Sequence, residues 1–326
     1  MKKYVLILTN SADGEHTESV ITKLLERGQN IFRLDVDRLA AGETKVHFRA
    51  DEDNFMFKLD SGGEVLSSSD VKSVWYRRPN FFNLQIKDTV QKKYAEDELS
   101  NFLEGLWLIL SDVFWLNNPK NLESARRKIY QLQLAKEVGF QIPRTIVTND
   151  ANEIRDFFSS CKGKVVFKAF YKEMLDYGEK KYNIPTTLIT PRHLQRIESV
   201  KQLPYLFQEF IDKSYELRIT VVGERLFPVR IDTSGNPQAI VDWRNPQFIN
   251  SLDYTVIDLP DAVKSRCLAM LERLGLSFGA FDLVVDKGGH YFFLEVNPNG
   301  QWYWLEALMK ILISDAIADI LSDERR

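Results

Sequence analysis

Two carboxylate side chains near the C-terminus, those of Asp282 and Glu295, lie in apolar runs with the composition of two strands of a β-hairpin. If they face each other, their Cβ atoms are about 5 Å apart, and such like charges are destabilising unless a cation lies between them. Asn297 follows Glu295 by two residues, so its amide oxygen points to the same face. An all-oxygen set of this kind suits magnesium. The spacing therefore predicts a divalent-cation site.

The register of this hairpin depends on its turn. Gly288-Gly289, taken as a two-residue loop, places Lys287 opposite His290 and, further along both strands, Asp282 opposite Glu295. A plainer interpretation stays open, in which the aspartate is a half-exposed strand residue, the glutamate pairs with a lysine and the Asn-Pro dipeptide only ends the strand.

Two lysines are candidates for binding an anionic ligand. Lys168 is the only charge in the apolar core of an expected strand over 164–170. An interior strand tolerates such a charge only beside an anion, whereas an edge strand lets the side chain reach water, and both alternatives stay open. Lys128 lies in an expected helix beside Arg126 and Arg127, where a solvated basic face is the ordinary explanation. Neither lysine identifies a site by itself.

An expected strand over 216–220 carries a second group of polar residues. Alternation puts Glu216, Arg218 and Thr220 on one face and two apolar residues on the other. Arg218 beside carboxylates and magnesium would suit a transferring phosphate, because a guanidinium matches phosphate oxygens and stays charged. A surface ladder of Glu and Arg is the alternative. Asp242-Trp243-Arg244-Asn245-Pro246 adds another arginine in an irregular stretch and indicates little alone.

The elements that position these residues follow from apolar periodicity. Segments 4–9, 31–36 and 73–76 have the composition of strands, with a hairpin over 46–59 and a long helix over 88–110. Alternating strands and helices over the first 118 residues predict an α/β domain with a parallel sheet. In the long helix we expect these residues to face inward: Val90, Tyr94, Phe102, Leu106 and Leu110.

The rest of the chain mixes helices and strands without strict alternation, which indicates an α+β arrangement. We expect three domains: an N-terminal α/β domain over 1–118, a central α/β lid subdomain over 119–204 and a C-terminal catalytic domain over 205–326. The lid subdomain includes a polar loop over 171–183. The catalytic domain includes a hairpin over 216–231.

Composition limits the function classes. With 326 residues, 44% hydrophobic and 27% charged, the chain is long enough for two or three packed domains and has no general signature of disorder. A net charge of -3 gives no electrostatic basis for general nucleic-acid binding. Cys161 and Cys267 lack CxxC spacing, which indicates buried reduced thiols. The N-terminal apolar run is too short for a secretion signal or a membrane span, so we expect a cytoplasmic protein.

The order of these residues along the chain resembles that of the ATP-grasp superfamily. The order is a helix lysine, a strand lysine, a Gln-Glu-Phe-Ile strand end, Glu-x-Arg, an aspartate and Glu-x-Asn-Pro. The resemblance implies an ATP-grasp fold, in which two sheets clasp ATP and a carboxylate is activated as an acyl phosphate with Mg2+ bound. It implies that the lysines meet the phosphates and adenine edge, that 208–211 forms the adenine hinge and that the acidic strand residue lies near the ribose. The implied ATP-binding residues are Lys128, Lys168, Gln208, Glu209, Phe210, Ile211 and Glu216; Arg218 and Arg244 neutralise the transferring phosphate, and Asp282, Glu295 and Asn297 bind magnesium.

A closer resemblance covers nearly the whole chain. Four segments are similar to the microviridin-type ATP-grasp macrocyclases, which are also called graspetide synthetases. These segments are Val74-Trp75-Tyr76-Arg77-Arg78-Pro79, residues 216–224, Asp242-Trp243-Arg244 and residues 294–302. These enzymes bind the leader helix of a ribosomal precursor peptide and join its Asp or Glu side chains to Ser/Thr hydroxyls or Lys amines. One departure is that the loop over 171–183 holds only Gly178, where many ATP-grasp relatives have a glycine-rich phosphate lid.

The resemblance implies an ATP-dependent ligase that closes macrocycles in a peptide. Arg77 and Arg78 would hold acidic side chains of the peptide by bidentate pairing, and a role in bracing the domain interface is an equal alternative. Two other functions stay open: a ligase that adds a free amino acid to a carboxylate, and a nucleotide-binding regulatory protein without turnover. The resemblance leaves open the general base, ester versus amide product, and whether two copies form a homodimer.

Overall fold

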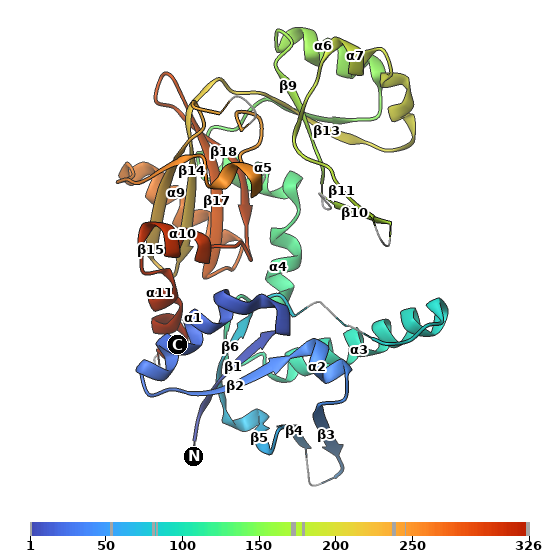
Figure 1. Ribbon diagram of the computed structural model, residues 1–326, viewed down its shortest axis with the longest axis vertical. Helices are drawn as coiled ribbons and strands as arrows, with labels where there is room; N and C mark the ends of the chain where they lie inside the picture. Colours follow the sequence, from blue (N-terminus) through green and yellow to red (C-terminus); the bar gives the residue numbers. More distant parts are fainter. Residues whose placement is uncertain are drawn as a thin grey trace.

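The computed structural model describes residues 2–52, 55–79, 82, 84–170, 174–177, 180–236, 239–244 and 246–323. It contains three packed units (Figure 1). One is built on a parallel sheet near the N-terminus, a large antiparallel sheet forms the body of the C-terminal half, and a smaller sheet stands beside that body. This arrangement confirms the expected α/β unit followed by an α+β fold.

The N-terminal unit combines a parallel sheet, in the order β2-β1-β6-β7, with a small antiparallel sheet, in the order β3-β4-β5. Its elements are β1 (Tyr4–Thr9), α1 (Gly14–Glu26), β2 (Asn30–Asp35), α2 (Val36–Ala40), β3 (Thr44–Ala50), β4 (Phe55–Ser61), β5 (Glu64–Ser67), β6 (Val71–Tyr76), α3 (Thr89–Ile109) and β7 (Phe114–Leu116). β1 is buried along its whole length, which explains its unbroken apolar sequence. The expected hairpin is β3–β4, and β5 is a strand that the sequence pattern does not predict.

Helix α3 packs on this unit only through its C-terminal half, while its N-terminal half extends away from it (Figure 1). Of the five residues expected to face inward, Leu106 and Leu110 are buried, and Val90, Tyr94 and Phe102 are exposed. The expectation is wrong for these three residues because apolar periodicity shows which face of a helix is apolar. It does not show which part of the helix extends beyond the domain.

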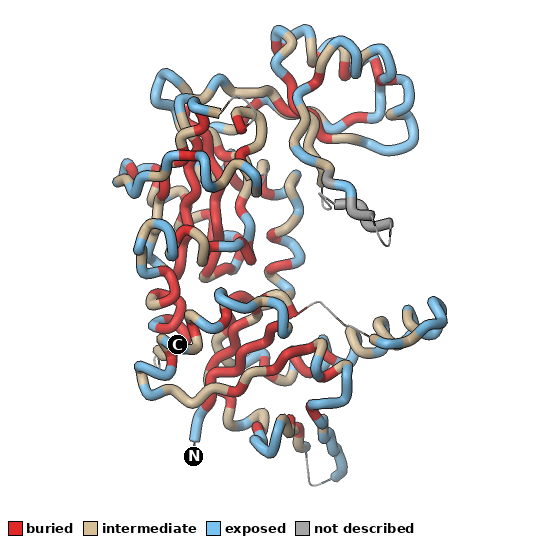
Figure 2. The backbone as a smooth tube through the Cα atoms, in the orientation of Figure 1, coloured by how far each residue is buried: buried red, intermediate tan, exposed pale blue. Residues whose placement is uncertain are grey.

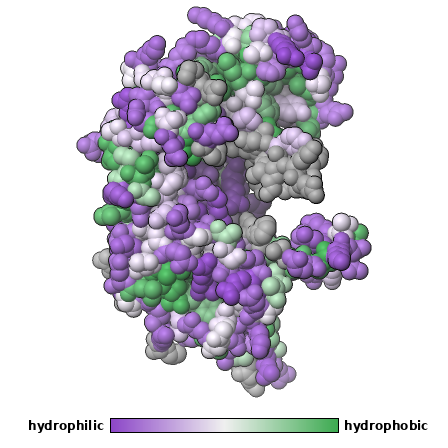
Figure 3. Space-filling model, in the orientation of Figure 1, coloured by the Kyte–Doolittle hydropathy of each residue, from purple (hydrophilic) through white to green (hydrophobic). Residues whose placement is uncertain are grey.

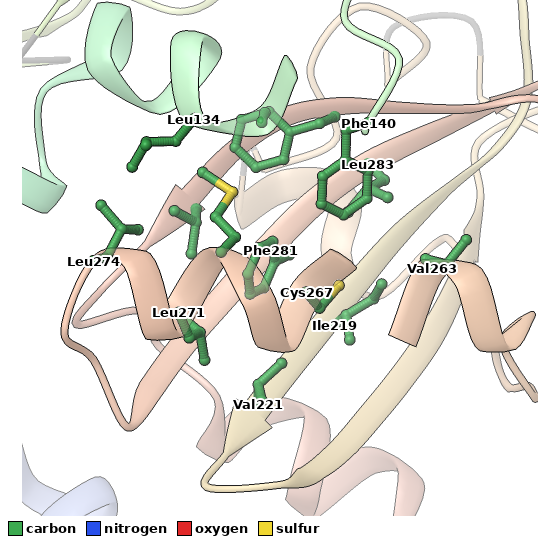
Figure 4. Close-up of a cluster of buried hydrophobic side chains, with 14 of the residues drawn as sticks. Leu134, Phe140, Ile219, Val221, Val263, Cys267, Leu271, Leu274, Phe281 and Leu283 are labelled. Carbon is green, nitrogen blue, oxygen red and sulfur yellow. The ribbon is translucent and has the colours of Figure 1, made fainter. Parts of the chain in front are cut away.

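The body of the C-terminal half is an antiparallel sheet in the order β16-β15-β14-β17-β18. Its elements are β14 (Lys213–Val222), β15 (Arg225–Asp232), α8 (Pro246–Ile249), β16 (Asp253–Val256), α9 (Asp261–Arg273), β17 (Phe278–Asp286), β18 (Tyr291–Asn297), α10 (Tyr303–Met309) and α11 (Ile313–Ser322). One face of the sheet packs against α9, α4 (Pro119–Ala125) and α5 (Lys128–Glu137). Figure 4 shows Ile219, Phe281, Cys267 and Leu271 meeting in this core. The other face is left for the site.

The smaller sheet has the order β12-β9-β13-β8, and a separate hairpin, β10–β11, is attached to the same unit. Its elements are β8 (Thr145–Thr148), α6 (Ala151–Ser160), β9 (Val165–Lys168), β10 (Met174–Tyr177), β11 (Lys180–Asn183), β12 (Thr187–Leu188), α7 (Pro191–Leu194) and β13 (Tyr205–Glu209). Helix α6 covers one face through Ile154 and Phe157, which pack on Val165 and Phe207. The expectation of a polar loop over 171–183 is wrong for residues 174–177 and 180–183, which form the paired strands β10 and β11. The rest of that loop, including Gly178, lies outside the described residues.

Two expected domain limits differ from the packing. β13 pairs with β8 and β9, so residues 205–209 belong to the smaller sheet and not to the C-terminal domain. α4 and α5 pack in the core of the C-terminal sheet, so residues 119–137 belong with that body and not with the lid. The division after residue 118 stays a prediction.

The N-terminal unit and the C-terminal body share a core at their junction. Helix α11 packs against α1 and against the face of the first sheet that carries Val5 and Ile7, together with Trp302 and Phe278 from the body. Figure 2 shows the buried segments running through both sheets, whereas the smaller unit is buried only along its centre. The first unit and the body are therefore joined by buried surface.

Candidate functional site

Asp282 on β17 and Glu295 on β18 are direct cross-strand partners, as predicted. The turn itself differs, because the Asp286 backbone N–H donates to the His290 carbonyl at 3.1 Å, so Lys287 does not lie opposite His290. The pairing next to the turn is therefore shifted by one residue. A bulge then restores the predicted register. Leu283 pairs with Phe293 and the next residue, Asp282, pairs with Glu295, so one residue of β18 between these pairs has no partner.

Each of the two carboxylates is paired with basic side chains. Arg218 donates to both carboxylate oxygens of Asp282, at 2.9 and 3.0 Å. Lys128 lies 3.1 Å from Glu295, and Arg244 lies 2.9 Å from the same carboxylate. The structure thus brings together five of the residues singled out in the sequence, and Lys128 faces the site and not solvent.

The two carboxylates have pKa values that are shifted in opposite directions. Burial raises the pKa of Asp282 despite the Arg218 guanidinium, and the charge of Glu295 adds to the rise. Burial also acts on Glu295, but Lys128, Arg244 and Lys168 outweigh it and lower its pKa to about 2. Oppositely shifted carboxylates are typical of functional sites.

Lys168 ends β9 and reaches the same cavity from the smaller sheet. Burial lowers its pKa to about 8, against the opposing effect of Glu295. Of the two alternatives left open by the sequence, the structure favours a lysine beside an anion, since Glu295 is its main electrostatic partner. β9 is an inner strand, between β12 and β13.

Glu216 is buried next to a lysine that sequence analysis did not select. Lys213 donates to Glu216 at 2.5 Å, and both side chains are only 6% exposed. Burial raises the pKa of Glu216, and Lys213 opposes the rise. The sequence signal for Lys213 is only its position three residues before Glu216, and a β-bulge at Lys213/Tyr215 brings the two together.

The segment 208–211 connects the smaller sheet to the body and lines the same cavity. Gln208 is fixed by a hydrogen bond to the Thr145 hydroxyl at 3.0 Å. The Phe210 backbone N–H donates to the Lys164 carbonyl at 2.9 Å. This segment therefore has the place of a hinge between two sheets.

Arg244 is held against Glu295 by the loop that precedes α8. Asp242 accepts hydrogen bonds from both the Nε and Nη2 atoms of Arg244, at 2.9 Å each. The same carboxylate accepts the backbone N–H of Thr186 in the smaller unit at 3.3 Å. Asp242 thus links the arginine to the unit that faces it.

Arg77 and Arg78 lie at the junction of the N-terminal unit and the body. Arg77 is 1% exposed, pairs with Asp13 at 3.0 Å and donates to the Asn299 carbonyl at 3.3 Å. Arg78 also donates to the Asn299 carbonyl. The position of Arg77 corresponds to the bracing alternative. Arg78 is less enclosed and has a left-handed backbone, with φ of 51°.

The selected residues surround one cavity between the smaller sheet and the body. Figure 3 shows a hollow with a hydrophilic interior between these two parts of the surface. Its lining includes Lys128, Lys168, Gln208, Glu209, Phe210, Ile211, Lys213, Glu216, Asp242, Arg244, Asp282, Leu294 and Glu295. Asn297 points from the same face of β18 but is exposed, and Arg218 reaches the site through Asp282.

The donor set at the Asp282–Glu295 pair fits a hard divalent cation. Within the part of the chain that the structure describes, no three His, Cys, Asp or Glu side chains form a metal cluster. A magnesium ion needs fewer, because it keeps water and phosphate ligands beside one or two carboxylates. Asp282 is 6% exposed and lies directly opposite Glu295, so two carboxylates face the same side of the sheet at this point.

Comparisons with known proteins show the family that this chain resembles. The MvdD pre-ATP grasp domain family matches residues 4–123. The macrocyclase MdnB from Microcystis aeruginosa MRC is 31% identical, covers 98% of this chain and 99% of its own, and superposes with a TM-score of 0.81. No curated protein matches the sequence. Among the described residues no helix is both long and apolar enough to cross a membrane.

Two further structures are also similar over nearly the whole chain. Macrocyclase MdnC from Microcystis aeruginosa MRC, solved with precursor peptide MdnA, is 29% identical over 98% of this chain and 99% of its own, with a TM-score of 0.86. A RiPP-associated ATP-grasp ligase from Chryseobacterium gregarium, solved with ADP and a leader and core peptide, is 28% identical over 99% and 97%, with a TM-score of 0.92. The chain belongs to the microviridin-type ATP-grasp macrocyclases, a family of ADP-forming ligases.

Proposed function

We propose that this protein uses ATP and Mg2+ to activate Asp or Glu side chains of a ribosomally made precursor peptide and closes macrocycles with Ser/Thr hydroxyls or Lys amines. The observation that carries the proposal is the Asp282–Glu295 pair, set between two sheets and surrounded by Lys128, Lys168 and Arg244. Two carboxylates for a metal and several cations for phosphates are what phosphoryl transfer to a carboxylate requires.

ATP would lie in the cavity between the smaller sheet and the body. Its adenine would meet the hinge 208–211, the Lys213–Glu216 pair would face the ribose, and Lys128 and Lys168 would meet the phosphates. The Chryseobacterium gregarium relative was solved with ADP, which supports this assignment. Lys213 is the addition that the structure makes to the residues selected from the sequence.

The metal would be held by Asp282 and Glu295, with Asn297 within reach on the same strand face. When bound, magnesium neutralises charge on the phosphate oxygens and lowers the cost of bringing a second anion close. Arg218 and Arg244 already contact the two carboxylates, so they lie where charge develops during transfer.

The chemistry takes two displacements. A carboxylate oxygen of the peptide attacks the γ-phosphorus, the bond to the β–γ bridging oxygen breaks, and ADP leaves. A hydroxyl or amine of the same peptide then attacks the acyl carbon, loses a proton and expels phosphate. Activation is needed because a free carboxylate is a poor acceptor, and the chain contributes proximity and orientation as well as charge.

We propose that the smaller unit moves when the nucleotide binds. The cavity measures about 60 Å³, which is below the usual range of ligand-binding pockets. Lys168 approaches from the smaller sheet and Glu295 from the body, so rotation about the hinge 208–211 would separate them.

We further propose that the enzyme works in the cytoplasm, in keeping with Cys161 and Cys267, which are both free thiols.

Mass spectrometry tests the proposal directly. Purified protein is incubated with ATP, Mg2+ and the short peptide encoded by the neighbouring reading frame, with Glu295→Gln as the matched inactive variant. Each ring closure should lower the peptide mass by one water and release one ADP. We expect no mass change with Glu295→Gln, whose fold should stay intact by circular dichroism.

Other outcomes would identify the other functions. A peptide that gains the mass of an added amino acid would indicate a ligase that extends carboxylates. An unchanged peptide with no ADP release would indicate a nucleotide-binding protein without turnover. Ring formation by Glu295→Gln at the wild-type rate would contradict the metal assignment.

A further inference from the structure

The strand that carries the Glu295 carboxylate lies at the edge of its sheet. Among the described residues β18 is the last strand in the sheet order, so one row of its backbone groups has no neighbouring strand. Buried backbone groups must still find partners. On one side of the bulge at Leu294, the Phe293 N–H donates to the Gln141 carbonyl at 2.8 Å. On the other side, at Val296, the partner is a side chain.

The Gln131 side chain takes the place of a neighbouring strand at Val296. Its Oε1 accepts the Val296 N–H at 3.0 Å, and its Nε2 donates to the Val296 carbonyl at 2.8 Å. Nε2 also donates to the carbonyl of Ala125, at the end of α4, at 2.6 Å. A glutamine amide has two N–H donors and one acceptor oxygen, so these three bonds fix its orientation. Gln131 is 3% exposed, which strengthens the bonds.

This pairing acts on the two residues that flank Val296. The side chain of Val296 points into the core, so the side chains of Glu295 and Asn297 leave the strand on the opposite face. Because Gln131 holds both backbone groups of Val296, it fixes the direction of both neighbours. Such support matters here, because the bulge at Leu294 interrupts the ladder to β17 directly before Glu295.

The same helix also contacts the Glu295 carboxylate. Lys128 and Gln131 are three residues apart on α5, so they lie on one face of the helix. Lys128 lies 3.1 Å from Glu295, and Gln131 binds the backbone of the next residue. The helix is itself anchored in the core of the body, for example through Leu134. One helix therefore sets both the backbone and a charge partner at this end of β18.

We propose that Gln131 is a positioning residue for magnesium: by pairing with both backbone groups of Val296, it holds Glu295 and Asn297 in the geometry that the metal requires. The inference rests on the proposed function, since that function supplies the metal. Gln131 is not among the residues that line the nucleotide cavity. It acts through the strand that carries the ligands, so its loss should lower the affinity for the metal and not the affinity for the nucleotide.

Metal affinity is the first test, and it needs no turnover. Calorimetry gives the dissociation constant of a nonhydrolysable ATP analogue, once with Mg2+ and once with EDTA in its place. Mg2+ should tighten binding to the wild type. Gln131→Met replaces the amide with an apolar side chain of similar length and should reduce this gain about tenfold, a usual effect of losing an outer partner of a metal ligand. Its affinity in EDTA should equal that of the wild type.

Amide hydrogen exchange tests the pairing itself, in the protein without nucleotide or metal. The Val296 amide should be protected in the wild type and should exchange about tenfold faster in Gln131→Met, because its acceptor is lost. Gln131→Asn keeps an amide in the core but is one carbon too short to reach Val296. It should therefore show the same two changes, and it provides the test if the methionine variant does not fold.

Two substitutions on the same helix separate positioning from stability. Gln133→Met makes the same exchange at an exposed position, where the side chain donates to Glu137 at 2.9 Å, and it should keep the wild-type gain from Mg2+. Leu134→Ala opens a cavity in the core and should lower the urea midpoint at least as much as Gln131→Met, again with the wild-type gain. A wild-type gain in Gln131→Met, or an equally reduced gain in Leu134→Ala, would overturn the positioning role.

Turnover distinguishes this inference from the function on which it rests. Ring formation by Gln131→Met should fall when Mg2+ is limiting. If this variant forms rings at the wild-type rate at every Mg2+ concentration, the positioning role is wrong while the macrocyclase function stands. If no enzyme forms rings but the gain from Mg2+ still falls in Gln131→Met, the positioning role stands and the function must be revised.

Discussion

At the scale of single residues, Lys168 is the cation whose charge state should control nucleotide affinity. Burial lowers its pKa to about 8, although Glu295 opposes the shift. The amino group therefore loses its proton as the pH rises through 8, where an exposed lysine stays charged. A triphosphate that needs this cation should bind about fivefold more weakly at pH 9 than at pH 8. Calorimetry with a nonhydrolysable ATP analogue measures the change.

Two variants make this pH prediction specific. Lys168→Met should bind the analogue weakly at both pH values, with no dependence on pH. Lys164→Met removes an exposed lysine of the same segment and should keep the wild-type profile. A flat wild-type profile between pH 8 and pH 9 would show that Lys168 does not carry the phosphate contact.

Residue types and spacing were enough to select most of the site. Strand alternation fixes which side chains share a face of the sheet. The shared position of four site residues could therefore be predicted: Glu216, Arg218, Asp282 and Glu295. Lys213 could not, because it joins Glu216 through a bulge that breaks this alternation. A bulge leaves no reliable mark in the sequence, so the residues that it reorients are found only in the structure.

At the scale of elements, the predicted pairing of Asp282 with Glu295 in the hairpin β17–β18 is correct although the predicted turn and the predicted regular ladder are both wrong. The two errors shift the register by one residue each, in opposite directions. The turn contains one residue more than expected, and β18 also contains one extra residue, Leu294, opposite the Asp282–Leu283 step. As a result Leu294 and Glu295 both line the cavity between the smaller sheet and the body, while Phe293 and Val296 remain in the core. The bulge therefore adds an apolar surface next to the Glu295 carboxylate.

Leu294 is half-buried and should contribute to nucleotide binding through this apolar surface. Leu294→Ala keeps the bulge but removes most of the side chain, and ATP-analogue affinity should fall about tenfold if the adenosine covers it. Deleting Leu294 should produce a similar loss, because a regular ladder from the turn would still place Asp282 opposite Glu295. If the deletion abolishes ADP release and the alanine variant does not, the bulge sets the carboxylate geometry instead.

At the scale of the whole molecule, segments distant in the sequence complete each unit. Helices α4 and α5 come before the smaller sheet in the chain but pack in the core of the C-terminal sheet, and α11 packs on the N-terminal unit. Sequence order predicts contiguous domains, so it could give the fold class but not these exchanges. The same connectivity places Lys128, at the first position of α5, beside Glu295.

Arg77 fixes the junction between the N-terminal unit and the body, so its loss should act on stability. It is 1% exposed and connects Asp13 of the first unit to Asn299 of the body. Arg77→Met leaves Asp13 without its ion-pair partner, and the free energy of unfolding measured with urea should fall by about 3 to 5 kcal/mol. Arg78→Met should change stability less, because Arg78 is less enclosed than Arg77. If Arg77→Met keeps full stability but no longer binds the precursor peptide, Arg77 binds substrate, and the two units are held together by the ion pairs of Arg27 with Asp315 and Asp319 and by the apolar contacts of α11.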